Sequence, residues 1–374
     1  MKHGFALIAV AGAVILLPGF LAATSLAHAV ASQHIPPAYG VEPQLSISET
    51  DARAELQTGT QLTTHGDLQQ AIPHLLVAQH AGIEPYATGV NLGICYLGTE
   101  NYRQAIVVLQ ALGDAGLGSG TVDNLLAQAY IGDAQPQDAL RTVRRAAGRG
   151  PQDEKFYAYL ADACSDHKDY SLGLQIVDQG LKENPASARL HYERGLFLSE
   201  LGFFEENGDR EFDRAAQLAP DSYIGFLALV QKDLYEDDFS GADKVLRQAI
   251  QSGHRDYRML SLLGTVLLHE GAAPGDARFA EAKNALETSA QENPSYSATQ
   301  IALGKIYLLE NEPQKAIDHL QIGRRLEPDN PAVYANLASA YDRLGDHAQA
   351  RLMRLQIGRL LAEKKSSGSA GQRP

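Results

Sequence analysis

Apolar and polar residues alternate along residues 302–331 as expected of two short amphipathic helices. Leu303 and Tyr307 lie about one helical turn apart, and Ile317 and Leu320 do so further along. Residues three or four positions apart share one face of an α-helix. Polar residues occupy most of the positions between them, including the turn that joins the two runs. The pattern therefore predicts a helical hairpin whose apolar faces pack against each other.

Small residues and prolines are placed to shape this hairpin. Gly304 and Ala316 allow the two helices to cross closely. Pro313 can open the second helix, where no backbone donor is needed, and Pro328 ends it. A fixed period predicts a stack of such hairpins. The pattern returns after 34 residues in the pairs Leu303 and Leu337, Gly304 and Ala338, Tyr307 and Tyr341, and Ala316 and Ala350.

The order Leu-Gly-x-x-Tyr, then Ala-x-x-x-Leu, then Pro resembles the tetratricopeptide repeat. The resemblance covers roughly residues 49–362 and divides them into nine units, although the chain has no tryptophan and Tyr334 stands where the family often has one. It implies an all-α fold, a right-handed α-solenoid of about nine stacked helix-turn-helix units.

Units five to seven depart from the repeat. Residues 202–216 of the fifth unit contain one extra residue, and the sixth unit lacks both the helix-crossing glycine and the closing proline. About six residues are inserted at residues 271–278 of the seventh unit. Insertions in a repeat array fall in loops, so we expect a longer turn there.

Both ends of the chain differ from the repeats. Lys2, an apolar run over residues 5–17 and small residues around Ala29 follow the order of a secretory signal peptide, so residues 1–31 are predicted to be cleaved. An uncleaved membrane anchor over residues 4–28 is the alternative. Residues 32–48 contain three prolines and predict a linker, and residues 363–374 predict a disordered polar tail. We therefore expect an extracytoplasmic protein, periplasmic or secreted, that touches a membrane only if the first segment is retained.

The net charge argues against a nucleic acid partner, and the cysteine positions argue against a disulfide. The chain of 374 residues has a formal charge of −13, so it has no electrostatic attraction to nucleic acid. Cys95 and Cys164 fall on corresponding helices two units apart, too far for a disulfide. Both cysteines are therefore predicted to be small buried residues.

Residue arrangements typical of an enzyme or a metal site are missing from the sequence. His74 and His80 are six residues apart and point to different helix faces, which predicts surface histidines. The glycines of residues 113–120 follow a helix, so they indicate a long turn and not a phosphate loop. The acidic clusters in residues 205–213 and 233–238 lack the ligand order of a calcium loop. We expect no cofactor, no metal and no catalytic activity.

The tetratricopeptide resemblance implies that the first helix of each unit lines a concave groove. Amide and tyrosine side chains suit an extended peptide ligand. Lys155, Arg189 and Asn124 only partly resemble the carboxylate-binding cluster known in the family. The predicted partner-binding residues are Asn91, Asn124, Gln128, Lys155, Asp162, Arg189, Tyr192, Gln231, Arg258, Thr265, Lys305, Asn336 and Ser339.

Two functions remain open from the sequence. The first is an exported, non-enzymatic scaffold that binds a peptide or partner protein of unknown identity in the groove. The alternative is a structural organiser of a cell-envelope assembly that acts through its ends and outer face.

Overall fold

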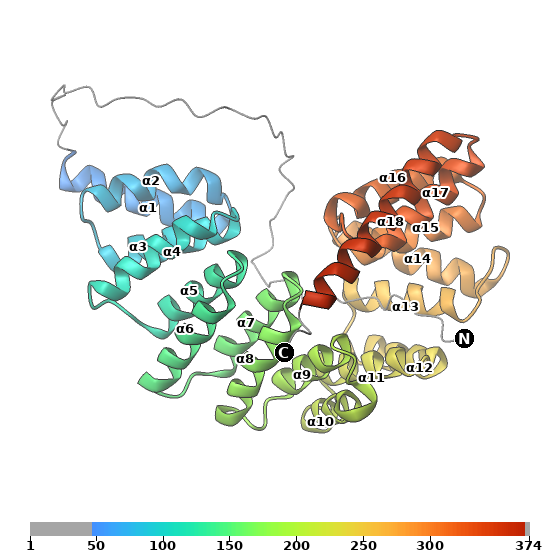
Figure 1. Ribbon diagram of the computed structural model, residues 1–374, viewed down its shortest axis with the longest axis horizontal. Helices are drawn as coiled ribbons and strands as arrows, with labels where there is room; N and C mark the ends of the chain where they lie inside the picture. Colours follow the sequence, from blue (N-terminus) through green and yellow to red (C-terminus); the bar gives the residue numbers. More distant parts are fainter. Residues whose placement is uncertain (1–46, 371–374) are drawn as a thin grey trace. The chain divides into compact units, whose positions relative to one another are not determined.

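The computed structural model describes residues 47–370, with side chains through residue 362. This range contains eighteen α-helices, one short π-helical segment and no β-strand (Figure 1). It divides after Gly202 into an N-terminal and a C-terminal compact unit. The N-terminal unit contains α1 Glu49–His65, α2 Leu68–His80, α3 Pro85–Gly98, α4 Tyr102–Asp114, α5 Gly120–Gly132, α6 Pro136–Arg149, α7 Glu154–Asp166, α8 Tyr170–Glu183 and α9 Ala188–Glu200. The C-terminal unit contains η1 Phe204–Gly208, α10 Asp209–Leu218, α11 Tyr223–Tyr235, α12 Phe239–Gln251, α13 Tyr257–His269, α14 Ala277–Glu292, α15 Ser297–Leu309, α16 Pro313–Leu326, α17 Pro331–Arg343 and α18 His347–Ala370.

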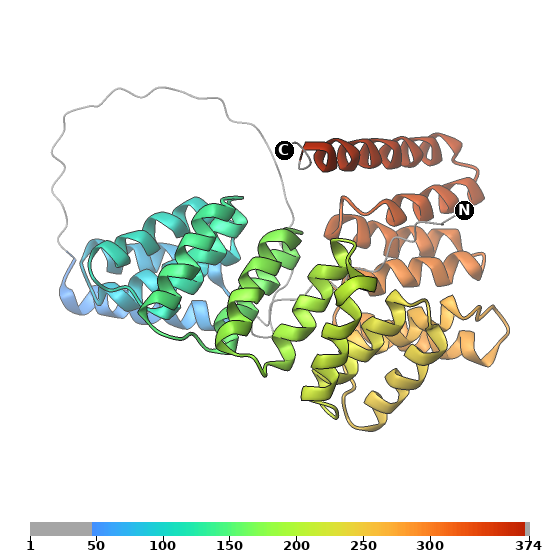
Figure 2. The same ribbon diagram turned by 60° about the horizontal axis from the view of Figure 1, so that its bottom comes forward.

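Consecutive helices pair as hairpins, and neighbouring hairpins stack within each unit (Figure 2). Except for α9 in the fifth pair, each first helix of a hairpin packs on its own second helix and, over most of each unit, on the first helix of the next hairpin. The boundary between the two units falls inside the fifth pair, between α9 and α10. The described residues thus confirm an all-α helical repeat with nine helix pairs.

The structure corrects the prediction made for the C-terminal tail. Helix α18 continues to Ala370, whereas a disordered tail was expected from residue 363. Leucine, alanine, glutamate and lysine favour a helix over residues 360–365, and no glycine or proline interrupts them before Gly368. The predicted signal peptide or anchor, residues 1–31, the linker up to residue 46 and residues 371–374 lie outside the described residues.

Short polar side chains start most of the first helices. Ser48, Ser119, Asp153, Ser187 and Ser222 each precede a first helix and accept a hydrogen bond from a backbone N–H two or three residues inside it. These bonds satisfy donors that have no partner within the helix. The chain therefore starts its first helices at nearly the same place in successive repeats.

The turn inside each hairpin has one residue in the left-handed region, with φ between 54° and 90°. This residue recurs every 34 positions over the first five hairpins. The step to the sixth hairpin is 35 positions and the step from the seventh to the eighth is 40, while the remaining steps are again 34. The two longer steps coincide with the extra residue of the fifth unit and the insertion of the seventh. The residues are Gly66, Glu100, Ala134, Lys168, Gly202, Asp237, Gly271, Asn311 and Gly345.

Glycines at the predicted crossing points permit close helix packing. A Cβ at Gly304 would lie 2.4 Å from the Cγ of Leu320, and one at Gly93 would lie 2.7 Å from the Cδ2 of Leu109. Both leucines are fully buried and cannot move aside. The structure therefore confirms that these positions need the absence of a side chain.

The irregular fifth unit takes up its extra residue as a π-helix. The N–H of Gly208 donates to the carbonyl of Phe203, five residues back, at 3.1 Å. A π-helical turn is the usual result of inserting one residue into an α-helix. Phe204 in this segment stacks on Tyr235 of α11, with ring centroids 5.2 Å apart. The seventh unit carries its insertion as the long turn between α13 and α14, as predicted.

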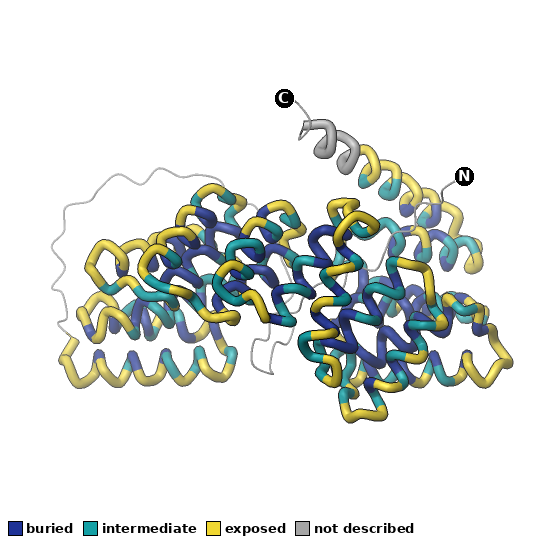
Figure 3. The backbone as a smooth tube through the Cα atoms, turned by 90° about the horizontal axis from the view of Figure 1, so that it is seen from below, coloured by how far each residue is buried: buried dark blue, intermediate teal, exposed yellow. Residues whose placement is uncertain are grey.

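The core of each unit runs along the seams between helices, and the exposed residues lie on the outer turns (Figure 3). In the N-terminal unit Leu92, Leu109, Leu160 and Ile176 are fully buried. Cys95 and Cys164 are also buried and unpaired with each other, as predicted. None of the helices in residues 47–370 has both the length and the apolar content of a membrane-spanning segment.

Candidate ligand-binding face of the first helices

The thirteen predicted residues all lie on first helices, seven in the N-terminal unit and six in the C-terminal unit. Neighbouring first helices contact one another through α3, α5, α7 and α9, and again through α13, α15 and α17. Residues on these helices can therefore form a shared face within each unit. The N-terminal set is Asn91, Asn124, Gln128, Lys155, Asp162, Arg189 and Tyr192, and the C-terminal set is Gln231, Arg258, Thr265, Lys305, Asn336 and Ser339.

Four predicted residues are buried and do not present their side chains at the surface. Asn124, Asp162, Tyr192 and Gln231 have exposed fractions of 7%, 6%, 3% and 1%. The prediction needs correction here, because these side chains are buried in the protein and do not face a ligand. For Asn124 and Asp162 the burial follows from the close approach of α5 to α7 and of α7 to α9, which one repeat viewed alone does not show.

Amide side chains tie α5 to α7. The Nδ2 of Asn124 donates to the carbonyl of Phe156 at 2.7 Å, and the Nε2 of Gln128 donates to the Oδ1 of Asn124 at 2.6 Å. One repeat earlier, the Nδ2 of Asn91 donates to the carbonyl of Ala87 at 2.9 Å. These three amide side chains therefore donate their hydrogen bonds to groups within the protein.

Arg189 is neutralised by two internal carboxylates. Its Nη2 lies 2.5 Å from the Oδ1 of Asp162 on α7 and 2.7 Å from the Oε1 of Glu193 on its own helix. The charge of Glu193, followed by that of Asp162, raises the pKa of the guanidinium against the effect of burial. Because both carboxylates are buried, removing Arg189 from them would leave unpaired charge in the interior. Of the partial resemblance to a carboxylate cluster, only Lys155 remains exposed.

Arg258 of α13 is held by aromatic neighbours. Its Nε donates to the hydroxyl of Tyr257 at 3.0 Å, and its guanidinium lies 5.5 Å from the centroid of that ring. Tyr257 in turn packs edge-on against Tyr296, with centroids 5.1 Å apart. This arrangement fixes the start of α13 against the start of α15.

The remaining C-terminal residues have unused hydrogen-bonding capacity. Thr265, Lys305, Asn336 and Ser339 are half-buried, and their side chains make no hydrogen bond or ion pair within residues 47–362. They lie on three first helices in succession, α13, α15 and α17. Half-buried polar groups of this kind are satisfied by water in the free protein and by a ligand when one binds.

Lys305 is the charged member of this set. Burial lowers the pKa of its ammonium, and no carboxylate offsets that effect. Its charge also lowers the pKa of His269 at the end of α13, in addition to the larger effect of burial on that ring. Phe239 stacks on His269, with centroids 4.8 Å apart. An anionic group at Lys305 would therefore find an uncompensated positive charge, and His269 and Phe239 are neighbours that the sequence pattern did not single out.

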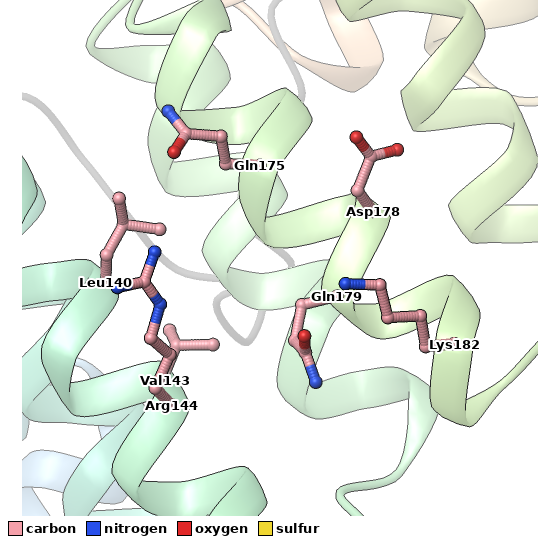
Figure 4. Close-up of a pocket in the computed structure, with 7 residues that line it drawn as sticks. All are labelled: Leu140, Val143, Arg144, Gln175, Asp178, Gln179 and Lys182. Carbon is pink, nitrogen blue, oxygen red and sulfur yellow. The ribbon is translucent and has the colours of Figure 1, made fainter.

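A pocket lies elsewhere, between the second helices α6 and α8 (Figure 4). It has a volume of about 260 Å³. Its lining residues are Leu140, Val143, Arg144, Gln175, Asp178, Gln179 and Lys182. Asp178 accepts a hydrogen bond from Arg194 at 2.7 Å, and Arg144 and Lys182 are exposed at the rim.

Groups suited to metal binding are absent from the described residues, where no three histidine, cysteine, aspartate or glutamate side chains converge. His74 lies half-buried on α2, with its Nδ1 2.5 Å from the Oε2 of Glu55, and His80 is exposed. The first acidic cluster packs beside α11, and the second begins on α11 and continues into the turn after it. The Nζ of Lys232 on α11 lies 2.8 Å from the Oδ1 of Asp213.

Comparison with known proteins agrees with the repeat geometry. Residues 301–352 match the family model of the tetratricopeptide repeat. A tetratricopeptide repeat protein from Parabacteroides merdae superimposes with a TM-score of 0.51 at 15% identity, covering 69% of this chain and 99% of that one. A chain of the APC/C hetero-tetramer Cut9-Hcn1 gives a TM-score of 0.50 at 13% identity, covering 83% and 74%. No curated protein sequence matches this chain.

Proposed function

We propose that this chain, which has the helical repeat fold of tetratricopeptide repeat proteins and matches their family model over residues 301–352, is a non-enzymatic scaffold that holds a peptide or partner protein against the first helices of its repeats. The observation that carries the proposal is the set of half-buried polar side chains on α13, α15 and α17 without internal partners. Thr265, Asn336 and Ser339 can exchange hydrogen bonds with a peptide backbone, and Lys305 can pair with a carboxylate of the ligand.

The N-terminal unit has a different role in this proposal. Its predicted contact residues are used for packing, as in the pairing of Arg189 with Asp162 and Glu193. We therefore assign the ligand contact to the C-terminal unit.

Site-specific photo-crosslinking in the producing cell tests the assignment. A crosslinking residue at Ser339 on α17 should capture a discrete partner, whereas one at the exposed Asp318 on α16 should not. Adding Lys305→Glu should lower the yield at Ser339 by about tenfold, since it reverses the charge facing the ligand. Equal capture at both positions, or a yield that Lys305→Glu leaves unchanged, would refute the assignment.

We also propose that the protein acts outside the cytoplasm, after cleavage near residue 29 or 31. The order of charge, apolar run and small residues in residues 1–31 supports this. Sequencing the N-terminus of the mature protein tests it. A chain that retains Met1 in the membrane fraction would support the anchor alternative instead.

A structural role in a cell-envelope assembly is the second candidate, and the exposed leucines of α18 favour it. Leu352 and Leu355 are 52% and 64% exposed. Substitutions at these positions leave the faces of α13, α15 and α17 intact. Loss of assembly with normal crosslinking at Ser339 would therefore identify the structural role.

A further inference from the structure

The pocket between α6 and α8 combines an apolar part with a polar part. Leu140 and Val143 of α6 form the apolar part and are 6% and 1% exposed. On α8, Gln175 and Gln179 add two amide groups to the lining. The volume of about 260 Å³ is enough for a ring or short chain that carries one polar group, since a cavity of about 150 Å³ holds benzene.

Two basic side chains of this pocket are free to bind a ligand. Arg144 of α6 and Lys182 of α8 stand on opposite sides of it (Figure 4). Neither makes a hydrogen bond or an ion pair within residues 47–362, and both are exposed. Guanidinium and ammonium groups form their strongest hydrogen bonds with carboxylates and other anions. One anionic ligand between the two helices could therefore use both charges.

The carboxylates nearest to these two cations already have other donors. Asp178, which also lines the pocket, accepts a hydrogen bond from the Nε of Arg194 at 2.7 Å. Glu183, the residue after Lys182, accepts one from the Nε2 of Gln179 at 3.1 Å. The free charge at the pocket is therefore positive, although the whole chain has a formal charge of −13.

A departure from the repeat pattern removes a partner from Arg144. In two other repeats, the residue at this place on the second helix is hydrogen-bonded to a tyrosine hydroxyl 20 residues later, on the next first helix. The residue 20 positions after Arg144 is Cys164, which is fully buried and has no hydroxyl. Arg144 therefore lacks the internal partner that this place has elsewhere in the array. The two bonded pairs are Gln110 with Tyr130 at 2.6 Å and Glu287 with Tyr307 at 3.2 Å.

We propose that this pocket binds a small organic carboxylate. The carboxylate group of the ligand pairs with Arg144 and Lys182, and its apolar part lies against Leu140 and Val143. This site is separate from the ligand face on α13, α15 and α17, and the proposal does not depend on that face.

An acidic stretch of polypeptide suits this surface less well than a small anion. The other arginines of α6 are paired within the protein, Arg141 with Asp138 and both Arg145 and Arg149 with Asp123. The unpaired positive charge of α6 is therefore confined to the pocket and does not extend along the helix. A row of carboxylates would find only the pocket charges to pair with.

A saturation-transfer NMR titration of the full chain with benzoate tests the proposal. Benzamide is the matched neutral probe, because it has the same ring and nearly the same shape without the charge. Acetate carries the carboxylate without the ring, and competition against benzoate measures both probes. Benzoate should bind saturably and at least about fivefold more tightly than either, and it should lose its advantage over benzamide at high salt.

Variants of the chain identify the site. Arg144→Gln and Lys182→Gln should each weaken benzoate binding by at least about threefold, since each removes one of the two charges that hold the carboxylate. Arg141→Gln is the matched control, because it removes the same charge from the same helix outside the pocket lining. It should leave benzoate binding unchanged, and circular dichroism should show all three variants folded.

Five results would overturn the proposal. These are the absence of saturable benzoate binding, equal binding of benzoate and benzamide, equal binding of benzoate and acetate, equal benzoate binding by Arg144→Gln and Arg141→Gln, and tighter binding of a glutamate-rich peptide than of benzoate. The third result would mean that charge alone holds the anion, and the fifth would identify an acidic protein segment as the occupant.

Discussion

A single carboxyl group on α11 makes the C-terminal unit sensitive to pH. Burial, and then the charges of Asp238 and Glu236, raise the pKa of Asp233 from 3.8 to about 6. The folded chain therefore binds a proton at this site more tightly than the unfolded chain does. Stability from this group is fully present below pH 3.8 and is lost as the pH rises through about 6.

We expect Asp233→Asn to be more stable than the unmodified chain at neutral pH. A pKa shift of this size corresponds to roughly 3 kcal/mol if fully expressed, and screening by solvent reduces the expected gain to about 1 kcal/mol. Urea unfolding at pH 4 and pH 7.5 measures it, and the gain should appear only at the higher pH. Asp213→Asn is the control, since it breaks the ion pair with Lys232 and should give no gain. A stability difference that does not change with pH would contradict the assignment.

Side-chain chemistry at the candidate site was only partly predictable. The repeat pattern placed Arg189 and Lys305 on first helices, and the structure agrees. The pattern could not show that Arg189 meets Asp162, 27 residues away, whereas Lys305 meets no carboxylate. Ion pairs of this kind depend on the contact between neighbouring repeats and not on the position within one repeat.

The helix pairs could be predicted from the sequence more directly than the side-chain contacts. The repeated glycine, alanine and tyrosine positions predicted nine helix pairs because close crossing leaves little choice of residue at those positions. The crossing at Gly304 shows the constraint most clearly, since a Cβ there would lie 2.4 Å from Leu320. Side-chain size at one point thus determines how two helices pack.

We expect Gly304→Ala to destabilise the protein by up to about 2 kcal/mol. The added methyl forces Leu320 or the helices apart, which typically costs about 1–3 kcal/mol, and the better helix propensity of alanine offsets about 1 kcal/mol of that. Gly148→Ala on α6 is the matched control, because nothing lies within 4 Å of a Cβ at that position. It should be neutral or slightly stabilising in the same chemical-unfolding measurement. Equal effects of the two substitutions would show that crossing distance is not what fixes glycine at residue 304.

Element ends were harder to predict than element positions. The extra residue in the fifth unit was visible as a break in the period, but its accommodation as a π-helix over Phe204–Gly208 depends on packing against Tyr235. The continuation of α18 to Ala370 was missed because a polar composition was read as disorder. Composition alone does not separate a solvated helix from a flexible tail when the residues are good helix formers.

On the scale of the whole molecule, stability is distributed over neighbouring repeats. Each of the two compact units buries its own apolar side chains, for example Leu92 and Leu109 in one and Leu303 and Leu320 in the other. In a repeat array each hairpin contacts only its neighbours, so the effect of a local change fades along the chain. A globular domain with a single core would spread the same change over all its elements.

Hydrogen exchange on the full chain distinguishes these two cases. Gly93→Ala places a Cβ 2.7 Å from Leu109 in the N-terminal unit, and Gly304→Ala places one 2.4 Å from Leu320 in the C-terminal unit. We expect Gly93→Ala to speed amide exchange in α3, α4 and the adjoining hairpins while α15 to α17 exchange as before. Gly304→Ala should give the reverse pattern, because the opening of one hairpin is coupled only to the hairpins that contact it. Faster exchange throughout residues 47–370 in both variants would instead mean that the two units unfold as one cooperative body, and the repeats would then not act as separable supports for their binding faces.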